Sequence, residues 1–535
     1  MWLTRAAGGL AVLFGHGDDD HPLWLLAIRA NVLLLVVALL VVAGRLARLR
    51  PGAVRRHGHE LLAAGACTLV ALAFRLFAAS NLLDQGGIPY SRMLLGYRGY
   101  FATAQAYSLV YFVEGRDLEH AILLNRLAGI ATVPLVFVLC RRLRPRSILF
   151  PTIAAGLLAL CPLHILFSAS DALSIFSGFL CALTFVLLAT DGAACFVAGL
   201  LALALLTQVR YENVLLVVPP VVLLALRGQR LKAAVCAVAG LAYAWPSVAA
   251  GISFQDHTAL IDGWRRVGSS EVLFNPFLGI PLLFGGALLV ALARRPGLLL
   301  GALLPWLVAG ALTVATAESP QHATHAFSNW LVPIVVAAGY GFSLLAERGI
   351  GARIATAMVL AYVAIKPVRY ASALSTRYLE MAEHEAFEAM LAAEPPGVTA
   401  VIVPDDERMR RRMGATIETM NKYSSVRRGL AKPGAPLVGI TDFLAGHAGA
   451  CKAGGCLFFA GLPCTVESIN TFAPPQCQAM GREHRLEPVA STTVTGAPFE
   501  RCAIYVGRMR ESICSVTERT VALTLYRVDG VGAPP

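Results

Sequence analysis

The sequence predicts a polytopic α-helical membrane protein with about 12 transmembrane helices, followed by a C-terminal extracytoplasmic α/β domain. The 535 residues are 57% hydrophobic and only 15% charged, with a mean hydropathy of +0.65. A soluble domain carries about 25% charged residues, so a wholly soluble or disordered chain is excluded. Apolar residues form blocks long enough to cross a bilayer until about residue 369. Beyond that point charged residues become frequent and apolar runs shorten to strand length.

Apolar windows of about 17–22 residues define the expected spans. They are residues 23–44, 60–79, 120–140, 148–168, 172–190, 193–208, 213–226, 233–252, 273–293, 298–317, 329–346 and 352–368. We therefore divide the chain into three parts. These are an N-terminal segment with one extra helix (1–59), a transmembrane domain (60–368) and a C-terminal domain (369–535).

The basic loops orient these spans, because Lys and Arg collect in cytoplasmic loops. If residues 45–60 are cytoplasmic, the same side receives the Arg-rich hairpin 141–147 and the basic turn 227–232. The opposite loops hold far fewer Lys and Arg, so both termini and the C-terminal domain lie outside. Arg greatly outnumbers Lys and Ala is abundant, which is typical of a GC-rich bacterial genome. We therefore expect a bacterial inner membrane and a periplasmic C-terminal domain.

The C-terminal region alternates between strand-like and helical patterns. Short apolar runs predict strands at 398–403, 456–460 and 521–526, and residues 379–393 predict a helix. An even number of cysteines outside the membrane predicts disulfides in an oxidising compartment. These cysteines are Cys451, Cys456, Cys464, Cys477, Cys502 and Cys514. The other six cysteines lie in predicted spans and are expected to behave as small apolar residues.

The formal net charge of +12 does not predict a nucleic-acid partner. Positive charge lies in short runs between apolar blocks, and no basic stripe is interleaved with aromatic residues. Glycine-rich stretches match neither a Walker nor a dinucleotide-binding pattern. The partner that the composition predicts is the lipid bilayer.

Residues that could carry chemistry lie in or beside the predicted outer loops. In chain order they are Asp84, Arg98, Arg126, Asp171, Arg210, Tyr211, His322 and His325. Carboxylates at such positions could act as a general base or hold a divalent metal, and Arg or His could hold a phosphate. The simpler interpretation is that turns between spans must be polar in any case, and that an arginine there snorkels to the interface.

The order of these segments is more informative than any one of them. Asp84 in a long first outer loop is followed by NRLAG at 125–129, LALCPLHILFSASDA at 158–172 and LLTQVRYEN at 205–213. A late outer turn from His322 leads into a proline-containing span. This series resembles the GT-C superfamily of polyprenyl-phosphate-sugar-dependent membrane glycosyltransferases, in particular family 39 and its protein O-mannosyltransferase-like members. The resemblance covers about residues 60–346.

The resemblance implies a GT-C-like fold and an activity. A hexosyl or pentosyl group would pass from a polyprenyl-phosphate donor to a protein or glycolipid acceptor on the outer face, with inversion. Asp84 would correspond to the catalytic base of the first loop, and Asp171 to a second acidic position at the active site or metal. Arg210 would stand near the lipid phosphate, with Arg98 and Arg126 as further phosphate candidates.

The remaining site predictions follow from the same likeness. Tyr211, His322 and His325 would contact substrate. A divalent cation, Mg²⁺ or Mn²⁺, is the one cofactor implied, with its ligands unassigned. The chain departs from the family pattern at two places. Gln85 follows Asp84 where the family often has an acidic pair, and the turn that ends at Ala172 lacks the frequent Gln-Glu-Ala-Arg motif. The span at 23–44 is extra.

The alternative function is a transporter or flippase of a lipid-linked glycan, which a large span count allows. A transporter is expected to show internal repeats and ionisable residues near mid-membrane. No clear repeat is found and the charged residues cluster at one face, which favours an enzyme. Within the enzyme class, a polymer ligase that uses the same carrier lipid also remains open.

Overall fold

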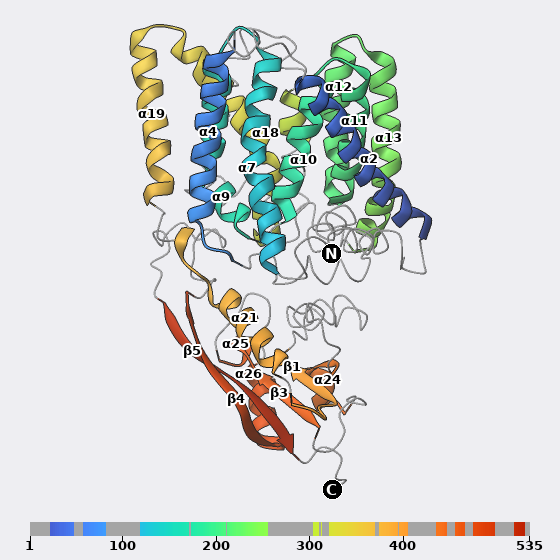
Figure 1. Ribbon diagram of the computed structural model, residues 1–535, viewed down its shortest axis with the longest axis vertical. Coiled ribbons are helices and arrows are strands. Elements are labelled where there is room, and N and C mark those ends of the chain that lie inside the picture. Colours follow the sequence, from blue (N-terminus) through green and yellow to red (C-terminus); the bar gives the residue numbers. More distant parts are fainter. Residues whose placement is uncertain are drawn as a thin grey trace.

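The structure is a computed structural model of the chain. It describes residues 22–47, 57–81, 118–170, 173–209, 211–254, 303–309, 312, 320–369, 374–393, 395–404, 435–446, 455–465, 474–497 and 518–529. Figure 1 shows a bundle of long helices at one end and a sheet with short helices at the other.

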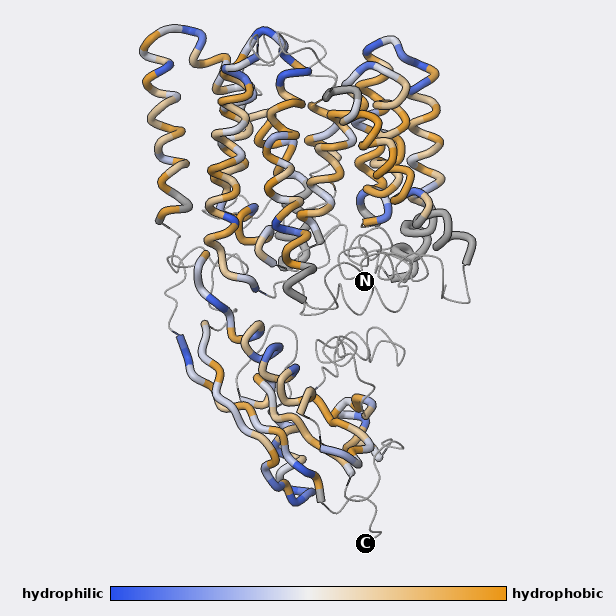
Figure 2. Tube along the Cα trace, viewed as in Figure 1, coloured by the Kyte–Doolittle hydropathy of each residue, from blue (hydrophilic) through white to orange (hydrophobic). Residues whose placement is uncertain are grey.

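The bundle follows the apolar blocks of the sequence. Its helices are α2 (Pro22–Ala47), α4 (Gly58–Phe77), α7 (Leu118–Leu143), α8 (Leu149–Ala159), α9 (Pro162–Ser168), α10 (Leu173–Leu188), α11 (Ala193–Val209), the 3-10 helix η1 (Tyr211–Val217), α12 (Val218–Leu226), α13 (Arg230–Phe254), α18 (Pro320–Ala346) and α19 (Ile350–Arg369). Large apolar side chains on the outward faces are exposed, among them Leu69, Leu231 and Ile350. Helices of this kind are orange along most of their length in Figure 2. An exposed apolar face is suited to lipid rather than to water.

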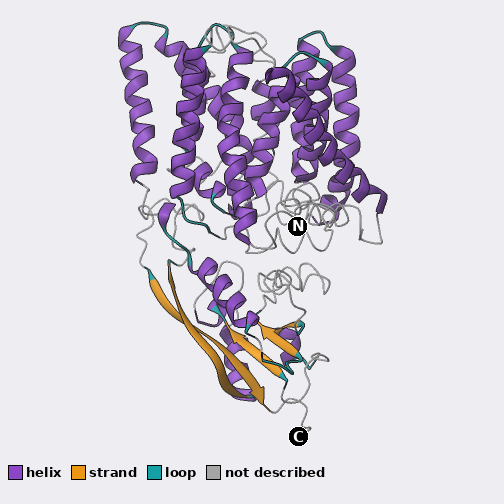
Figure 3. Ribbon diagram, in the orientation of Figure 1, coloured by secondary structure: helices purple, strands orange, loops and turns teal. Residues whose placement is uncertain are grey.

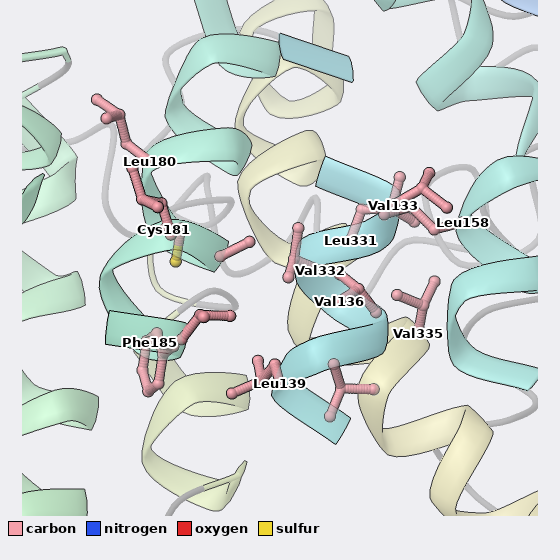
Figure 4. Close-up of a cluster of buried hydrophobic side chains, with 14 of the residues drawn as sticks. Val133, Val136, Leu139, Leu158, Leu180, Cys181, Phe185, Leu331, Val332 and Val335 are labelled. Carbon is pink, nitrogen blue, oxygen red and sulfur yellow. The ribbon is translucent and has the colours of Figure 1, made fainter. Parts of the chain in front are cut away.

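The centre of the bundle is packed from α7, α8, α10 and α18. Val133 and Val136 of α7 lie beside Leu331 and Val332 of α18, with Leu158 of α8 next to them (Figure 4). These side chains are all buried. Dense apolar packing of this type holds the helices at fixed separations, which is what a polar site at their ends requires.

The number of spans stays a prediction. By length and composition, two described helical segments can cross a membrane, Gly58–Phe77 and Ile122–Leu143. Leu149–Ala159 with Pro162–Ser168 adds a third if the bent pair is one span. In other apolar helices the stretches described with their side chains, such as Ala30–Gly44 of α2 and Trp330–Ala346 of α18, are shorter. The predicted span 273–293 lies outside the described residues.

Two predicted spans look different in the structure. The region 148–168, expected as one helix, is two helices that meet at 58°. Pro162 begins α9, and because proline has no N–H it cannot continue the hydrogen-bond ladder of α8. The span at 298–317 is described only at 303–309 and 312. There Trp306 stacks on Phe185 of α10 with ring centroids 4.0 Å apart.

The basic hairpins gather at the end of the bundle away from the sheet. The connections α12–α13 and α18–α19 both lie there (Figure 1) and include blue, hydrophilic segments in Figure 2. Arg144 Nη2 pairs with Glu347 Oε2 at 2.8 Å, and Arg141 pairs with Glu60. The sheet and the basic hairpins are thus at opposite ends, as the charge argument requires. Which side of the membrane each end faces stays a prediction.

The C-terminal region forms a five-stranded mixed sheet (Figure 3). Its order is β2-β1-β3-β5-β4. The strands are β1 (Ala400–Val403), β2 (Leu437–Gly439), β3 (Cys456–Ala460), β4 (Arg485–Gly496) and β5 (Arg519–Asp529). β1 runs parallel to β2 and β3, and β5 runs antiparallel to β3 and β4.

Short helices flank this sheet. They are α21 (Leu379–Ala392), α24 (Ile440–Leu444), α25 (Leu462–Thr465) and α26 (Pro474–Glu483). The expected strands match β1, β3 and β5, and the expected helix matches α21. β4 was missed because its side chains are mostly exposed and polar, so it has no apolar run. A disulfide between Cys464 and Cys477 joins α25 to α26.

Replacing Gly339 is expected to disturb the contact between α18 and α8. A Cβ added at Gly339 would lie 2.6 Å from the Ala154 Cβ and 2.8 Å from the Ala154 backbone nitrogen. Overpacking of this kind costs about 1–3 kcal/mol. We expect Gly339→Ala to lower the thermal unfolding temperature of the detergent-purified protein.

Gly156 of α8 is the matched control, because a Cβ there meets nothing within 4 Å. Gly156→Ala should be neutral or should stabilise the helix by about 0.5–1 kcal/mol. Equal unfolding temperatures for the two variants would contradict the close packing of α8 and α18.

Candidate functional site

The residues predicted from sequence are only partly described. Four of them lie outside the described residues, namely Asp84, Arg98, Asp171 and Arg210. For three others the structure gives the backbone, with Tyr211 at the start of η1 and His322 and His325 near the start of α18. Arg126 of α7 is described with its side chain. The site must therefore be built from Arg126 and from the described residues that flank the two acids.

The structure brings together the two segments that lead to the predicted acids. The backbone N–H of Asn81 donates to the carbonyl oxygen of Ala169 at 3.0 Å, and Asn81 forms a parallel bridge with Ser170. Both residues are buried. Asp84 follows Asn81 by three residues and Asp171 directly follows Ser170. Both acids are therefore attached, by one to three residues of chain, to the bridge between Asn81 and Ser170.

Two neighbouring residues of α7 fasten these segments. Asn125 Nδ2 donates to the Ser170 carbonyl at 2.7 Å. Arg126 Nη2 donates to the Ala78 carbonyl and to Ser80 Oγ, both at 2.9 Å. Arg126 is thus held by the chain leaving α4 instead of extending freely to the interface. Its guanidinium places a permanent positive charge beside the segment that leads to Asp84, where it can balance an anion.

A buried arginine absent from the sequence predictions, Arg75 of α4, closes the break between α8 and α9. It is fully buried. Its Nη1 donates to the Ala159 carbonyl at 3.3 Å and its Nη2 to the Leu158 carbonyl at 3.4 Å. In a continuous helix the residue at 162 would donate to Leu158, but Pro162 has no N–H. The Leu158 carbonyl instead accepts from the Cys161 N–H at 3.3 Å and from the guanidinium.

The same guanidinium also holds α9. Its Nε donates to Ser168 Oγ at 3.3 Å, and its Nη2 contacts His164 Nδ1. Because a guanidinium only donates hydrogen bonds, Nδ1 of His164 is the acceptor. Gly129 of α7 leaves the necessary room, since a Cβ there would lie 2.1 Å from Ser168 Oγ. Arg75 thus anchors the short helix that ends three residues before Asp171.

A sequence signal for Arg75 was present. It lies inside the predicted span 60–79, and an ionisable residue inside a span is by itself a marker of function or of a buried partner. Asn81 and Asn125 carried no comparable signal, because an asparagine at the end of a helix or in a loop is common.

The start of η1 is anchored by Asn213. Its Nδ2 donates to Ser177 Oγ of α10 at 2.9 Å and to the Leu206 carbonyl of α11 at 2.8 Å. Asn213 is fully buried. The backbone around the predicted Tyr211 is therefore joined to two helices of the bundle.

Among the residues that the structure describes, no three or more His, Cys, Asp or Glu side chains are grouped as metal ligands. Asp171, which the family resemblance links to the active site or a metal, is outside those residues. The described part of the site thus offers hydrogen-bond donors and a cation, suited to an anionic group.

Comparisons with known proteins bear on the fold. No protein-family model and no curated protein matches the sequence. ArnT from Cupriavidus metallidurans, solved bound to undecaprenyl phosphate, is 12% identical and covers 90% of this chain and 99% of its own, with a TM-score of 0.51. Its apo structure covers 88% of this chain and 98% of its own, with a TM-score of 0.52.

An archaeal oligosaccharyltransferase, AglB from Archaeoglobus fulgidus in complex with an inhibitory peptide and a dolichol-phosphate, is 14% identical with a TM-score of 0.47. It covers 69% of this chain, which spans only 64% of the AglB length. AglB and ArnT are both membrane glycosyltransferases of the GT-C superfamily. At these identities the likeness to ArnT is one of fold: a polytopic membrane fold with a C-terminal soluble domain.

Removing the Arg75 guanidinium is expected to destabilise the bundle. Arg75→Met would leave the buried Ala159 carbonyl without this donor, whereas the Leu158 carbonyl keeps the Cys161 N–H. An unsatisfied buried acceptor costs about 1–3 kcal/mol. Thermal unfolding of the purified protein in detergent measures the effect.

The control is Arg141→Met at the other end of the bundle, where a partly exposed ion pair with Glu60 and hydrogen bonds to the Pro145 and Ser147 carbonyls are lost. Such a pair contributes about 0–1 kcal/mol. An Arg75→Met variant no less stable than Arg141→Met would show that Arg75 does not brace the α8–α9 break.

Proposed function

We propose that the protein is a membrane glycosyltransferase that transfers a sugar, hexose or pentose, from a polyprenyl-phosphate carrier to an acceptor at the sheet-facing end of the bundle. One observation carries the proposal. On a fold like that of ArnT, the segments leading to Asp84 and Asp171 are joined at Asn81 and Ser170, and Arg126 is hydrogen-bonded to the first of them.

The chemistry follows from these groups. The acceptor hydroxyl oxygen attacks the anomeric carbon of the donor while its proton passes to the Asp84 carboxylate, which acts as general base. The bond from the anomeric carbon to the phosphate oxygen breaks, and the lipid phosphate leaves with the bonding electrons. One displacement of this kind inverts the configuration at the anomeric carbon.

The leaving phosphate gains negative charge in the transition state, so a cation placed beside it accelerates the reaction. Arg126 is the described residue suited to this role, because its guanidinium is fixed by the Ala78 carbonyl and by Ser80. Arg98 and Arg210 are the further candidates for the phosphate. We assign Tyr211, His322 and His325 to contacts with the substrates, and Asp171 to the second acidic position.

The carrier and the location belong to the same proposal. ArnT was solved bound to undecaprenyl phosphate, which supports a polyprenyl phosphate as the donor's carrier. The acceptor is a protein or a glycolipid, and the family 39 or mannosyltransferase-like specificity is part of the hypothesis. The basic hairpins would face the cytoplasm of a bacterial inner membrane, and the sheet would face the periplasm.

Loss of Asp84 is the direct test. Purified wild-type protein is given a panel of radiolabelled polyprenyl-phosphate sugars together with a membrane extract as the source of acceptor. General-base catalysis contributes about 10²–10⁴-fold, so we expect Asp84→Asn to lower kcat by that factor while the protein still folds. Asp191→Asn is the control, since Asp191 is exposed in the turn between α10 and α11 and should retain wild-type transfer.

Other outcomes would change the proposal. Transfer that survives Asp84→Asn would keep the reaction and move the base, with Asp171→Asn as the next variant. No transfer from any donor would overturn the enzyme and favour the transporter or flippase of a lipid-linked glycan.

A divalent cation is tested separately. Mg²⁺ and Mn²⁺ prefer carboxylate and carbonyl oxygens, and Asp171 at the second acidic position is a candidate ligand. If the cation is required, dialysis against EDTA should abolish transfer and added Mg²⁺ or Mn²⁺ should restore it. Full transfer after EDTA would remove the cation from the proposal.

A further inference from the structure

Two described residues of the chain that joins the bundle to the sheet are buried. A connection between domains is usually exposed and makes few contacts. Here Leu374 and Tyr378, between α19 and α21, are fully buried and belong to the same apolar cluster as the centre of the bundle. Burial also raises the pKa of the Tyr378 hydroxyl, with the nearby Glu380 carboxylate adding to the shift. This connection is therefore part of the packed structure.

Asn81 holds this connection by its side chain. Its Oδ1 accepts a hydrogen bond from the backbone N–H of Tyr378 at 2.8 Å, and its Nδ2 donates to the Thr376 carbonyl at 3.0 Å. The backbone N–H of Ala79 donates to the Leu374 carbonyl at 2.9 Å. The side-chain amide thus forms the hydrogen bonds that a neighbouring strand would form with residues 374–378. Tyr378 is 297 positions from Asn81 in the sequence.

The backbone of Asn81 forms a hydrogen bond with a different segment, the turn before Asp171. Its N–H donates to the Ala169 carbonyl at 3.0 Å, in the turn before Asp171. A single residue is therefore fixed on both sides: its backbone by the second outer turn and its side chain by the connection to the sheet.

The connection is in turn paired with the end of β4. The N–H of Ala497 donates to the Arg377 carbonyl at 3.1 Å, and the N–H of Leu379 donates to the Ala497 carbonyl at 3.0 Å. Gly496 allows the close approach, since a Cβ there would lie 2.9 Å from the Arg377 carbonyl oxygen. Hydrogen bonds thus run without interruption from the turn at 169–170, through Asn81, to the C-terminal sheet.

We infer that Asn81 is a positioning residue that couples the C-terminal sheet to the segment carrying Asp84. The inference rests on the proposed function, because it assigns Asn81 an effect on Asp84 as base. In this inference Asn81 does not itself contact the reacting atoms. It sets the start of the first outer loop relative to the turn before Asp171, and so the alignment of the base with the acceptor.

The chemistry of the asparagine amide makes the inference specific. Its Nδ2 donates to the Thr376 carbonyl and its Oδ1 accepts from the Tyr378 N–H, both in the same backbone stretch. Aspartate keeps the acceptor for Tyr378 but loses the donor to Thr376, and alanine loses both. A misalignment of about 1 Å at a reacting group can cost about 10²-fold in rate.

The experiment compares Asn81→Ala and Asn81→Asp with Asn31→Ala in the full-length protein. Asn31 is also buried and donates from its side chain to the Leu201 carbonyl of α11, away from the connection. Two quantities are measured: kcat and donor KM for transfer, and amide hydrogen exchange in the peptides covering 374–379 and 496–497.

We expect Asn81→Ala to lower kcat about 10²-fold with little change in donor KM, and to raise exchange at both peptides. Asn81→Asp keeps the shape of the side chain but sets a carboxylate oxygen against the Thr376 carbonyl, so it should also lower kcat and raise exchange. It remains informative if Asn81→Ala does not fold. Asn31→Ala should lower the unfolding temperature without changing kcat or exchange at the connection.

Three results would overturn the inference. These are unchanged exchange in both Asn81 variants, raised exchange with unchanged kcat, and a kcat for Asn31→Ala as low as that of Asn81→Ala. If the wild-type protein transfers no sugar, the proposed function fails on that result alone, and with it the role of Asn81 in catalysis. The exchange data would still decide whether Asn81 joins the sheet to the bundle.

Discussion

The guanidinium of Arg75 is the interaction on which the sheet-facing end of the bundle depends. A broken helix inside a membrane leaves carbonyl groups that water cannot reach, and each must find a donor within the protein. Arg75 supplies donors to Leu158 and Ala159 from a neighbouring helix. The break can then persist, α9 can turn, and the segment towards Asp171 starts from a fixed place.

The polar groups of the bundle are sorted by end. Basic hairpins and their ion pairs occupy one end, and the described side-chain amides of Asn81 and Asn125 with Arg126 occupy the other. Apolar packing between them, as at Val136 and Val332, keeps the two ends apart and the helices in register. Hydrogen bonds from Asn81 through Tyr378 to Ala497 then join the bundle to the sheet, so the two parts are connected by more than the covalent chain.

Much of the fold could be predicted from sequence. Apolar blocks predicted helices that correspond to α4, α7, α10 and α11, and short apolar runs predicted β1, β3 and β5. β4 was not predicted, because its side chains are mostly polar and exposed and form no apolar run. Arg75 and Asn81 were not predicted for another reason. Their partners lie up to 93 and 297 positions away, respectively, and no local sequence pattern indicates such pairs.

Hydropathy and charge are sums over neighbouring residues, so the sequence by itself determined which segments are apolar enough for lipid and which hairpins are basic. It also placed Asp84 and Asp171 in loops of the same predicted side. A hydrogen bond instead needs two groups within about 3 Å in space. Only the tertiary structure therefore decided that Asn81 meets Ala169 on one side and the connection to the sheet on the other.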